Sequence, residues 1–248
     1  SGEILYLTDA DCILDDDWVE ATLAPLIQYD ENAVTGFWQP FESDKKRPFV
    51  AYQWANHLRY QASMPDWAEN LDGRNSAIRR DALISAGAFQ NEAAIGTDYV
   101  LSQKLKTAGF RIRSVISSRV QTEYAAEIPL YLQQNSRWYR NRLVQGIKFG
   151  QWRDVTLSLW GAGASLFMLA GSLAFLARWR AAGYAWLAGL FHLGLSQARL
   201  AAFFRLSGLD RSKYLDNLLS FMGYAMVSNL SMVNGLLASI DGRKRKTW

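Results

Sequence analysis

The chain has 248 residues, of which 50% are hydrophobic and 20% are charged, and its formal net charge is +4. This length suffices for one large domain or two modest ones, and the apolar content excludes a disordered tail. The single cysteine, Cys12, excludes an internal disulfide, and with only two histidines beside it a structural zinc site is not expected.

The net positive charge of the chain comes from its C-terminal part. Residues 1–154 hold 17 Lys/Arg against 20 Asp/Glu, a net charge of −3, whereas residues 155–248 hold 10 against 3, a net charge of +7. A nucleic-acid-binding face would mix cations with hydrogen-bonding groups on one folded surface. Here the cations flank apolar runs, which is typical of a membrane region. We therefore expect contact with a membrane and no nucleic-acid partner.

Strands and helices alternate over the first 150 residues. The chain opens on a short apolar run, at 3–8, that predicts a buried strand. Further elements are expected in this order: helix 18–28, strand 33–38, helix 48–61, strand 75–79, helix 81–86, helix 97–108, strand 110–116 and helix 127–142. Gly87-Ala88-Phe89 breaks the chain between two of the helices. This alternation predicts an α/β layered domain over residues 1–150.

Residues 151–248 contain three apolar runs that are candidate membrane spans, at 155–177, 181–204 and 214–240. The first has no charged residue over its whole length, and as a helix it spans roughly 34 Å, enough to cross the hydrocarbon core. A buried helical hairpin in a soluble protein is the alternative. Arg199 in the second run is expected to lie within a turn of the membrane edge and to extend its charge into the headgroups.

Three crossings create a conflict of topology. From a cytoplasmic domain they would place the basic run Arg243–Lys246 outside, against the positive-inside tendency. Either one run is re-entrant or interfacial, or the topology is unusual.

Two aspartates directly follow the first predicted strand. Ligands of open α/β sheets bind beyond the C-terminal ends of strands, where Asp9 and Asp11 stand. On an extended segment, carboxylates at this spacing point the same way and can hold one divalent cation, which can bridge a substrate diphosphate. The similarly spaced Asp15 and Asp17 are more simply explained as solvated acids at the start of a helix.

Four segments together carry a family resemblance. They are LTDADCILDDDW, GRNSAIRRDALISAGAF, GTDYVLSQKLKTAGFRI and QQNSRW, in this order and followed by apolar runs. The chain resembles the family 2 glycosyltransferases of the GT-A fold, in the membrane-attached branch that includes cellulose-, chitin- and hyaluronan-synthase-like enzymes. The resemblance implies an α/β fold, namely the C-terminal part of a GT-A-type mixed sheet with flanking helices, followed by a transmembrane α-helical region.

The resemblance also implies an activity and its residues. A sugar would pass from a nucleotide-sugar donor, a UDP-sugar, to a lipid or growing glycan, with inversion at the anomeric carbon. Asp9 and Asp11 would hold Mg²⁺ or Mn²⁺ against the donor diphosphate, and Asp98 would be the general base. The alternative for Asp98 is an ordinary acid at a helix N-terminus. Thr97 replaces the glutamate that usually precedes this aspartate, so the acceptor environment is expected to differ.

The remaining site residues follow from the other two motifs. Gly73 and Asn75 would line the acceptor site, although Gly-x-Asn is equally well only a turn. Gln134, Arg137 and Trp138 form the last motif, in which Arg137 would bind the diphosphate as a fork. Trp138 would stack on a sugar, or else would be an aromatic of the membrane interface.

We expect a multi-pass protein of a bacterial inner membrane with its catalytic domain in the cytoplasm. The family's N-terminal half, with the nucleotide-base pocket, is not recognisable here, so this chain alone is expected to be a fragment without activity. Three apolar runs leave no room for a long channel, which favours a lipid or short acceptor. The alternatives are an inactive docking module at the membrane, or a transporter in which Arg199 pairs with Asp216.

Overall fold

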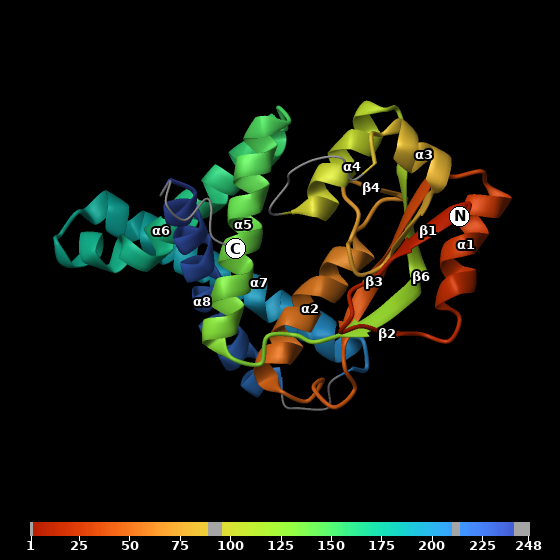
Figure 1. The fold of residues 1–248 in the computed structure, drawn as a ribbon. Helices are drawn as coiled ribbons and strands as arrows, with labels where there is room; N and C mark the ends of the chain where they lie inside the picture. The colour runs from red at the N-terminus through yellow and green to blue at the C-terminus, as the bar shows by residue number, and fades with distance from the viewer. Residues whose placement is uncertain (1, 89–95, 210–213, 241–248) are drawn as a thin grey trace. The chain divides into compact units, whose positions relative to one another are not determined.

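The computed structural model describes residues 2–88, 96–209 and 214–240 and divides into two compact units (Figure 1). The first unit comprises residues 1–44 and 60–124, and the second comprises residues 45–59 and 125–248. Phe89 and the basic run Arg243–Lys246 lie outside the described residues. The expected domain boundary at residue 150 stays a prediction.

Strands of the first unit form one mixed sheet. In the described residues its order is β1-β5-β3-β6-β2, and β4 pairs with the N-terminal end of β6. Neighbouring strands are antiparallel except β3 and β6, which are parallel. The strands are β1 (Ile4–Leu7), β2 (Ile13–Leu14), β3 (Ala33–Pro40), β4 (Trp67–Ala68), β5 (Ser76–Arg79) and β6 (Ile112–Thr122).

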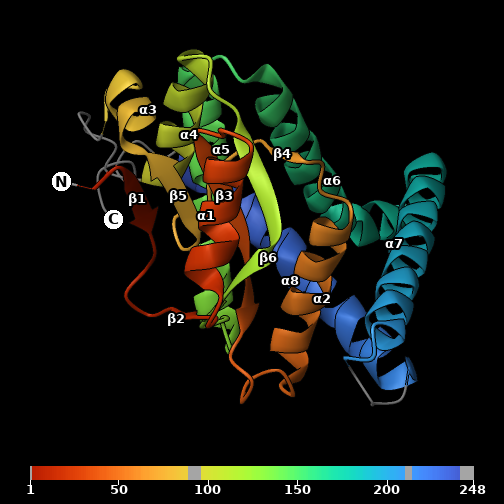
Figure 2. The same ribbon diagram turned by 90° about the vertical axis from the view of Figure 1, so that its right-hand side faces the viewer.

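Helices cover both faces of this sheet (Figure 2). Helix α1 (Trp18–Gln28) covers one face of the sheet. Its Leu26 forms a core there with strand residues such as Val34, and Ile4 and Tyr6 of β1 pack against this core. Helices α3 (Arg80–Ser85) and α4 (Thr97–Thr107) cover the other face, where Leu5 and Leu7 contribute. The alternation of β1 side chains between the two cores is what a strand inside a three-layer α/β domain requires.

The predicted strands and helices are all present, with differences at their ends. Strand β6 continues six residues beyond its predicted end, and the two-residue strands β2 and β4 were not predicted. The expectation of a fully buried first strand was wrong. Every residue of β1 is half-buried, because among the residues that the structure describes the strand pairs on one side only, with β5.

The side chain of Asn75 holds the middle of the sheet together. Its Oδ1 accepts hydrogen bonds from Trp18 Nε1 and Ser118 Oγ, both at 2.8 Å, and its Nδ2 donates to the carbonyls of Phe37 (2.8 Å) and Ser118 (3.1 Å). Asn75 is fully buried, so one amide satisfies polar groups of α1, β3 and β6 that water cannot reach. Gly36 leaves room for this amide, because a Cβ at Gly36 would collide with Asn75 Nδ2.

The second unit consists of helices. Helix α2 supplies Phe49, Tyr52 and Trp54 to an aromatic core, in which Phe49 lies 4.5 Å from Tyr224 and Trp54 lies 5.6 Å from Phe204 between ring centroids. The helices are α2 (Pro48–Ala62), α5 (Ile128–Lys148), α6 (Trp152–Leu176), α7 (Arg180–Leu206) and α8 (Tyr214–Ile240).

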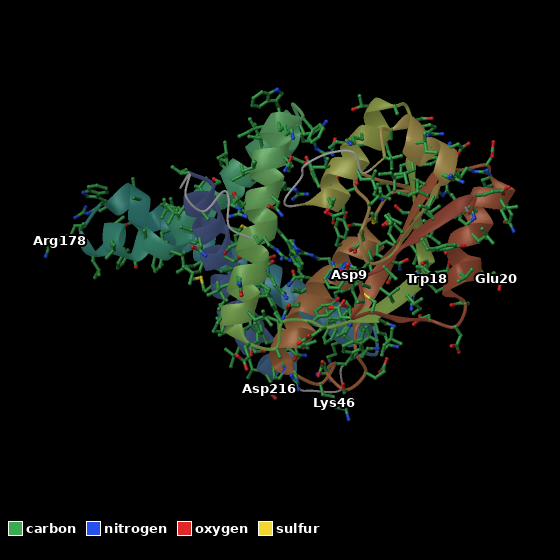
Figure 3. The ribbon with its side chains drawn as sticks, in the orientation of Figure 1. Asp9, Trp18, Glu20, Lys46, Arg178 and Asp216 are labelled. Atoms are coloured by element: carbon green, nitrogen blue, oxygen red, sulfur yellow. The ribbon has the colours of Figure 1, made fainter. Side chains whose placement is uncertain are left out.

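Helices α6 and α7 form an antiparallel hairpin closed by small residues. Gly171 contacts Trp186, whose Nε1 donates to the Met168 carbonyl at 3.1 Å, and a Cβ at Gly183 would lie 2.9 Å from Phe175. Arg178 lies at the turn of the hairpin (Figure 3). Small residues that allow such close approach are typical of helix pairs in membranes.

In the described residues, α6 and α7 are the helices long and apolar enough to cross a membrane. Only 17% and 22% of their most apolar windows are buried, whereas a core helix of a soluble protein would be mostly covered. Helix α8 forms over the whole third run but is not apolar enough for this test.

Polar residues explain why α8 differs from the other two long helices. Ser136 on α5 donates to the Ser231 carbonyl of α8 at 3.1 Å and accepts from Asn234 Nδ2 at 3.0 Å. The face of α8 that packs within the unit is therefore partly polar. No ion pair joins Arg199 to Asp216, both of which lie in the described residues, so the observation on which a transporter depended is missing.

Replacing Asn75 by alanine is expected to lower the free energy of unfolding by about 3 kcal/mol, because Trp18 Nε1 and two carbonyls lose their buried partner. Urea unfolding in detergent, followed by tryptophan fluorescence, measures the change. The exposed Ser117→Ala is the control and should change stability by less than about 0.5 kcal/mol. Equal stability of the two variants would contradict the assigned role of Asn75.

Candidate functional site

The two aspartates after β1 lie in a turn. Ala10 and Asp11 turn the chain back, and Cys12 N–H donates to the Asp9 carbonyl at 3.2 Å. The expectation that residues 9–11 form an extended segment was therefore wrong. Both aspartates are nevertheless solvent-exposed, beyond the C-terminal end of β1.

The described residues contain no group of three His, Cys, Asp or Glu side chains arranged to hold a metal ion. Magnesium is commonly bound by one or two carboxylates together with waters and substrate phosphates. An exposed pair such as Asp9 and Asp11 fits that kind of site, in which the diphosphate and water supply the remaining ligands.

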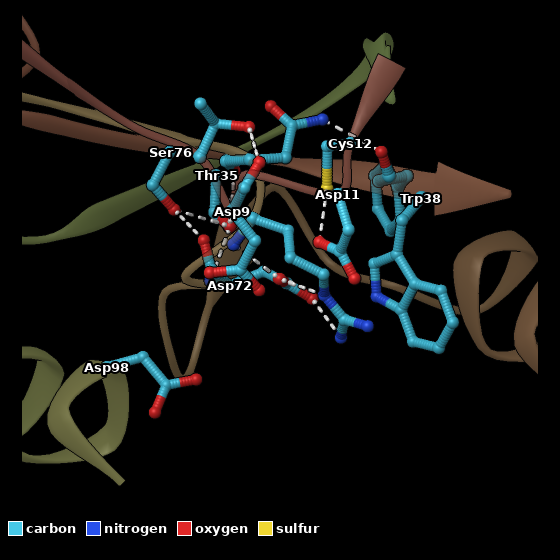
Figure 4. A network of polar contacts seen from close by, with 12 residues as sticks. Asp9, Asp11, Cys12, Thr35, Trp38, Asp72, Ser76 and Asp98 are labelled. Carbon is cyan, nitrogen blue, oxygen red and sulfur yellow. Dashed lines mark hydrogen bonds and ion pairs between the residues drawn. The ribbon is translucent and has the colours of Figure 1, made fainter. Parts of the chain in front are cut away.

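A tight loop before β5 brings Asp72, labelled in Figure 4, together with Arg74. Arg74 Nε donates to Asp72 Oδ1 at 3.0 Å and Nη2 donates to Oδ2 at 3.3 Å, which makes a two-pronged ion pair. The backbone N–H of Arg74 also donates to Asp72 Oδ1, at 3.0 Å. The two side chains are only 18% and 22% exposed, so solvent screens this pair less than a surface pair.

The guanidinium of Arg74 also stacks on an aromatic side chain from β3. It lies 3.9 Å from the ring centroid of Trp38, and the Trp38 ring lies 4.7 Å from that of Tyr124. Burial raises the pKa of Tyr124 well above its ordinary value, so its hydroxyl stays protonated. Its O–H donates to the Trp38 carbonyl at 3.4 Å. The result is a fixed cation held between an aspartate and an indole ring.

Asp98 stands in the first turn of α4. Gly96, in the left-handed conformation with φ of 72°, precedes the helix and sets its start, which a residue with a side chain would do under strain. Tyr99 N–H donates to Asp98 Oδ1 at 2.8 Å. A Cβ at Gly73 would lie 3.7 Å from Asp98 Cβ and 3.9 Å from Oδ2, so the Asp72 loop lies directly against Asp98.

The surroundings of Asp98 raise the pKa of its carboxyl group. The side chain reaches solvent, but protein crowds around it, and this loss of hydration is the largest cause of the raised pKa. The Tyr99 N–H opposes that effect, and the like charge of Asp72 adds to it. The pKa direction that a helix N-terminus favours for an acid is thus overridden here.

The predicted site residues fall in both units. Asp9, Asp11, Gly73, Asn75 and Asp98 belong to the first unit, and Figure 4 shows Asp98 on a neighbouring helix, apart from Asp9, Asp11 and Asp72. The side chain of Asn75 is buried with all its hydrogen-bonding groups engaged by protein, which indicates a structural role.

The last motif belongs to α5, in the second unit. Gln134, Arg137 and Trp138 are three and four residues apart and therefore share one face of the helix. Gln134 is half-buried, Arg137 is exposed and Trp138 is 41% exposed. The side chains of Arg137 and Trp138 are thus open to solvent, as contact with a diphosphate or a place at the membrane interface requires.

Sequence reasoning did not identify Asp72, Arg74, Trp38 and Tyr124 as parts of the site. Asp72, Gly73 and Arg74 directly precede the Asn of the motif, but the sequence does not indicate that Asp72 and Arg74 form an ion pair. Trp38 is in β3 and Tyr124 follows the end of β6 by two residues, so only the pairing of these strands in the fold brings the two rings together.

Asp98→Asn is expected to raise the free energy of unfolding at pH 7. The pKa of Asp98 is higher in the folded than in the unfolded chain, so ionised Asp98 costs stability once the pH exceeds the folded pKa. Asparagine removes that charge while its Oδ1 still accepts the Tyr99 N–H. Thermal unfolding from pH 7 down to pH 3 should show the gain disappearing as the wild-type carboxyl protonates.

Asp81→Asn is the matched control for that comparison. Asp81 is exposed, and it accepts the next residue's N–H, that of Ala82, at 2.8 Å in the first turn of α3. Because it removes a charge that the helix dipole favours, it should not stabilise the chain. A gain at Asp81 as large as that at Asp98 would contradict the explanation by lost hydration.

Residues 4–209 match the model of a family described as glycosyl transferase family group 2. No curated protein matches the chain. The fold is similar to that of the mannosyltransferase PcManGT from Pyrobaculum calidifontis, solved in complex with GDP-Man and Mn²⁺, with a TM-score of 0.50 and 14% sequence identity.

The matched region covers 97% of this chain and 63% of that mannosyltransferase, so the chain spans less than two thirds of the length of this structural relative. At this identity the likeness shows the fold alone. The family model, by contrast, matches residues 4–209, which is most of the sequence. The chain therefore belongs to glycosyl transferase family group 2.

Proposed function

We propose that the chain is the catalytic and membrane-anchoring part of an inverting glycosyltransferase that takes a sugar from a nucleotide-diphosphate donor. The observation that carries the proposal is the meeting of three features in the first unit. These are the exposed Asp9–Asp11 turn, the Asp72–Arg74 loop and the raised pKa of Asp98 beside that loop.

Asp98 is the proposed general base. A base works best when its pKa lies near the operating pH, and an aspartate at a helix start would ordinarily be too acidic. Crowding and the neighbouring Asp72 both raise its pKa, which makes the carboxylate a stronger proton acceptor. Asp98 would take the proton from an acceptor hydroxyl as that oxygen attacks the anomeric carbon.

Asp9 and Asp11 are the proposed ligands of a divalent metal, Mg²⁺ or Mn²⁺. Bound there, the metal would neutralise charge that develops on the leaving diphosphate. The structural relative was solved with GDP-Man and Mn²⁺, which supports a divalent metal and makes a GDP-linked sugar a candidate donor beside a UDP-sugar. Arg137 is the proposed second contact to the diphosphate, and Gly73 lies on the acceptor side, next to Asp98.

Helices α6 and α7 are the proposed membrane anchor. Two crossings return the chain to its starting side, which removes the conflict that three crossings create with the positive-inside tendency. Three basic residues flank the open end of the hairpin, namely Lys148, Arg153 and Arg205. Two lie at its turn, Arg178 and Arg180. This bias supports a cytoplasmic location for α5. Anchoring in a membrane is what favours a lipid or growing glycan as acceptor.

Asp98→Asn and Asp11→Asn are each expected to lower kcat by about 10²–10⁴-fold in the full-length protein, because they remove the base and a metal ligand. Release of nucleoside diphosphate from GDP- and UDP-sugars measures turnover. Chelation by EDTA should abolish it, and Mn²⁺ or Mg²⁺ should restore it. Asp17→Asn, an exposed acid next to α1, is the control and should leave kcat unchanged. Full activity of the Asp98 variant would favour a docking module instead.

The orientation of the hairpin is tested with single cysteines in a Cys12→Ser background. Arg178 and Lys148 are both exposed, so a cysteine at either position is open to reagents. A membrane-impermeant maleimide should label Arg178→Cys in intact cells and Lys148→Cys only after permeabilisation. The reverse pattern would overturn the proposed orientation, and labelling of both in intact cells would overturn the anchor.

A further inference from the structure

The loop of Asp72 and Arg74 is anchored on every side. Asp72 N–H donates to Thr35 Oγ1 at 2.9 Å, and the Asp72 carbonyl accepts from Ser76 Oγ at 2.6 Å. Arg74 is fixed by the two-pronged bond to Asp72 and by stacking on Trp38. An arginine held by a fork and a ring has lost most of its freedom before any ligand arrives.

This loop is also tied to the helix that carries Asp98. Ser102 Oγ accepts the Leu71 N–H at 2.7 Å and donates to the Asp98 carbonyl at 2.6 Å. Gly73 lies against the Asp98 side chain, because a Cβ added at Gly73 would lie only 3.7 Å from Asp98 Cβ. Any shift of the loop therefore moves the surroundings of the Asp98 carboxylate.

Resting on the proposed function, we infer that Asp72 and Arg74 are positioning residues for Asp98. They hold the Gly73 backbone against it and set the balance of charge around its carboxylate. Neither residue needs to touch the substrate for this role. They act through the loop, which Ser102 joins to the start of α4.

The two members of the pair act on Asp98 in opposite directions. Among charged side chains of the described residues, Asp72 and Arg74 are those that act on Asp98 most, the aspartate as a like charge and the arginine as an opposite one. Asp9 in turn faces Arg74 as a further negative charge. The cations of α4, Lys104 and Lys106, lie in its last turn, far along the helix from Asp98.

The test is the pH dependence of kcat/KM for the full-length protein with a fixed nucleotide-sugar. Its acid limb reports the protonation of the free enzyme's base. Asp72→Asn removes the like charge next to Asp98 while the positive charge of Arg74 stays, so the limb should move to lower pH. Arg74→Gln removes the opposite charge, so the limb should move to higher pH. The double variant loses both charges and should return the limb towards its wild-type position.

Arg74→Lys separates charge from geometry. Lysine keeps the positive charge but lacks the fork and the flat face that stacks on Trp38. Its acid limb should stay near the wild-type position while kcat falls about 3- to 10-fold, since an imprecisely placed base lowers the rate. Asp30→Asn, which breaks the ion pair of Asp30 with Arg79 elsewhere in the unit, is the control and should change neither quantity.

The outcomes separate this inference from the proposed function. Opposite shifts in the two single variants support the inference, whereas unmoved limbs or shifts in the same direction overturn it. If Asp98→Asn retains full turnover, the proposed function itself is wrong. If Asp98→Asn is inactive while the limbs of the Asp72 and Arg74 variants stay in place, only the positioning role is wrong. Far-ultraviolet circular dichroism checks that each variant is folded.

Discussion

The buried amide of Asn75 is the interaction on which the first unit depends. This one side chain makes four hydrogen bonds, and they join α1 to β3 and β6, two parallel strands that are more than 70 residues apart in sequence. An amide offers two donors and a two-fold acceptor in one plane, and here all of them are used. Because an unpaired polar group in this position costs stability, the amide also fixes how β3 and β6 meet.

The site is a consequence of that arrangement. The loop that ends at Asn75 can present Asp72, Gly73 and Arg74 only in one way, because its last residue is locked in the core. Thr35 and Trp38 come from β3, the strand that Asn75 binds, and they hold the loop from the other side. Asp98 then meets a rigid loop, and a rigid environment can keep a carboxylate's pKa raised without rearranging during the reaction.

Much of the fold was predictable because its cores follow regular periods. Short strand-like segments at β3 and β5, the acids at the start of α1 and the amphipathic spacing of α4 identified those elements. The motifs singled out Asp9, Asp11 and Asp98, whose roles stay predictions. The spacing of apolar residues cannot predict a two-residue strand such as β2, nor the turn at residues 9–12. It also cannot tell that the Asn of the Gly-x-Asn motif points into the core, since that depends on Trp18 and Ser118.

The helices of the second unit show the same limit. Apolar length predicted three long helices, and all three form, but only the contacts of α8 with Ser136 distinguish a helix with a polar packing face from the α6–α7 hairpin. Positions of Ser and Asn along the third run were visible in the sequence, yet their partners on α5 were not.

The central claim is that Asp98 promotes direct attack of an acceptor hydroxyl on the donor sugar. Proton NMR of the product formed in the first minutes of reaction tests it most directly, through the coupling constant of the new anomeric proton. A single displacement predicts that the configuration is inverted relative to the donor. A product with retained configuration would contradict the account, because it would require a mechanism in which Asp98 is not simply the base.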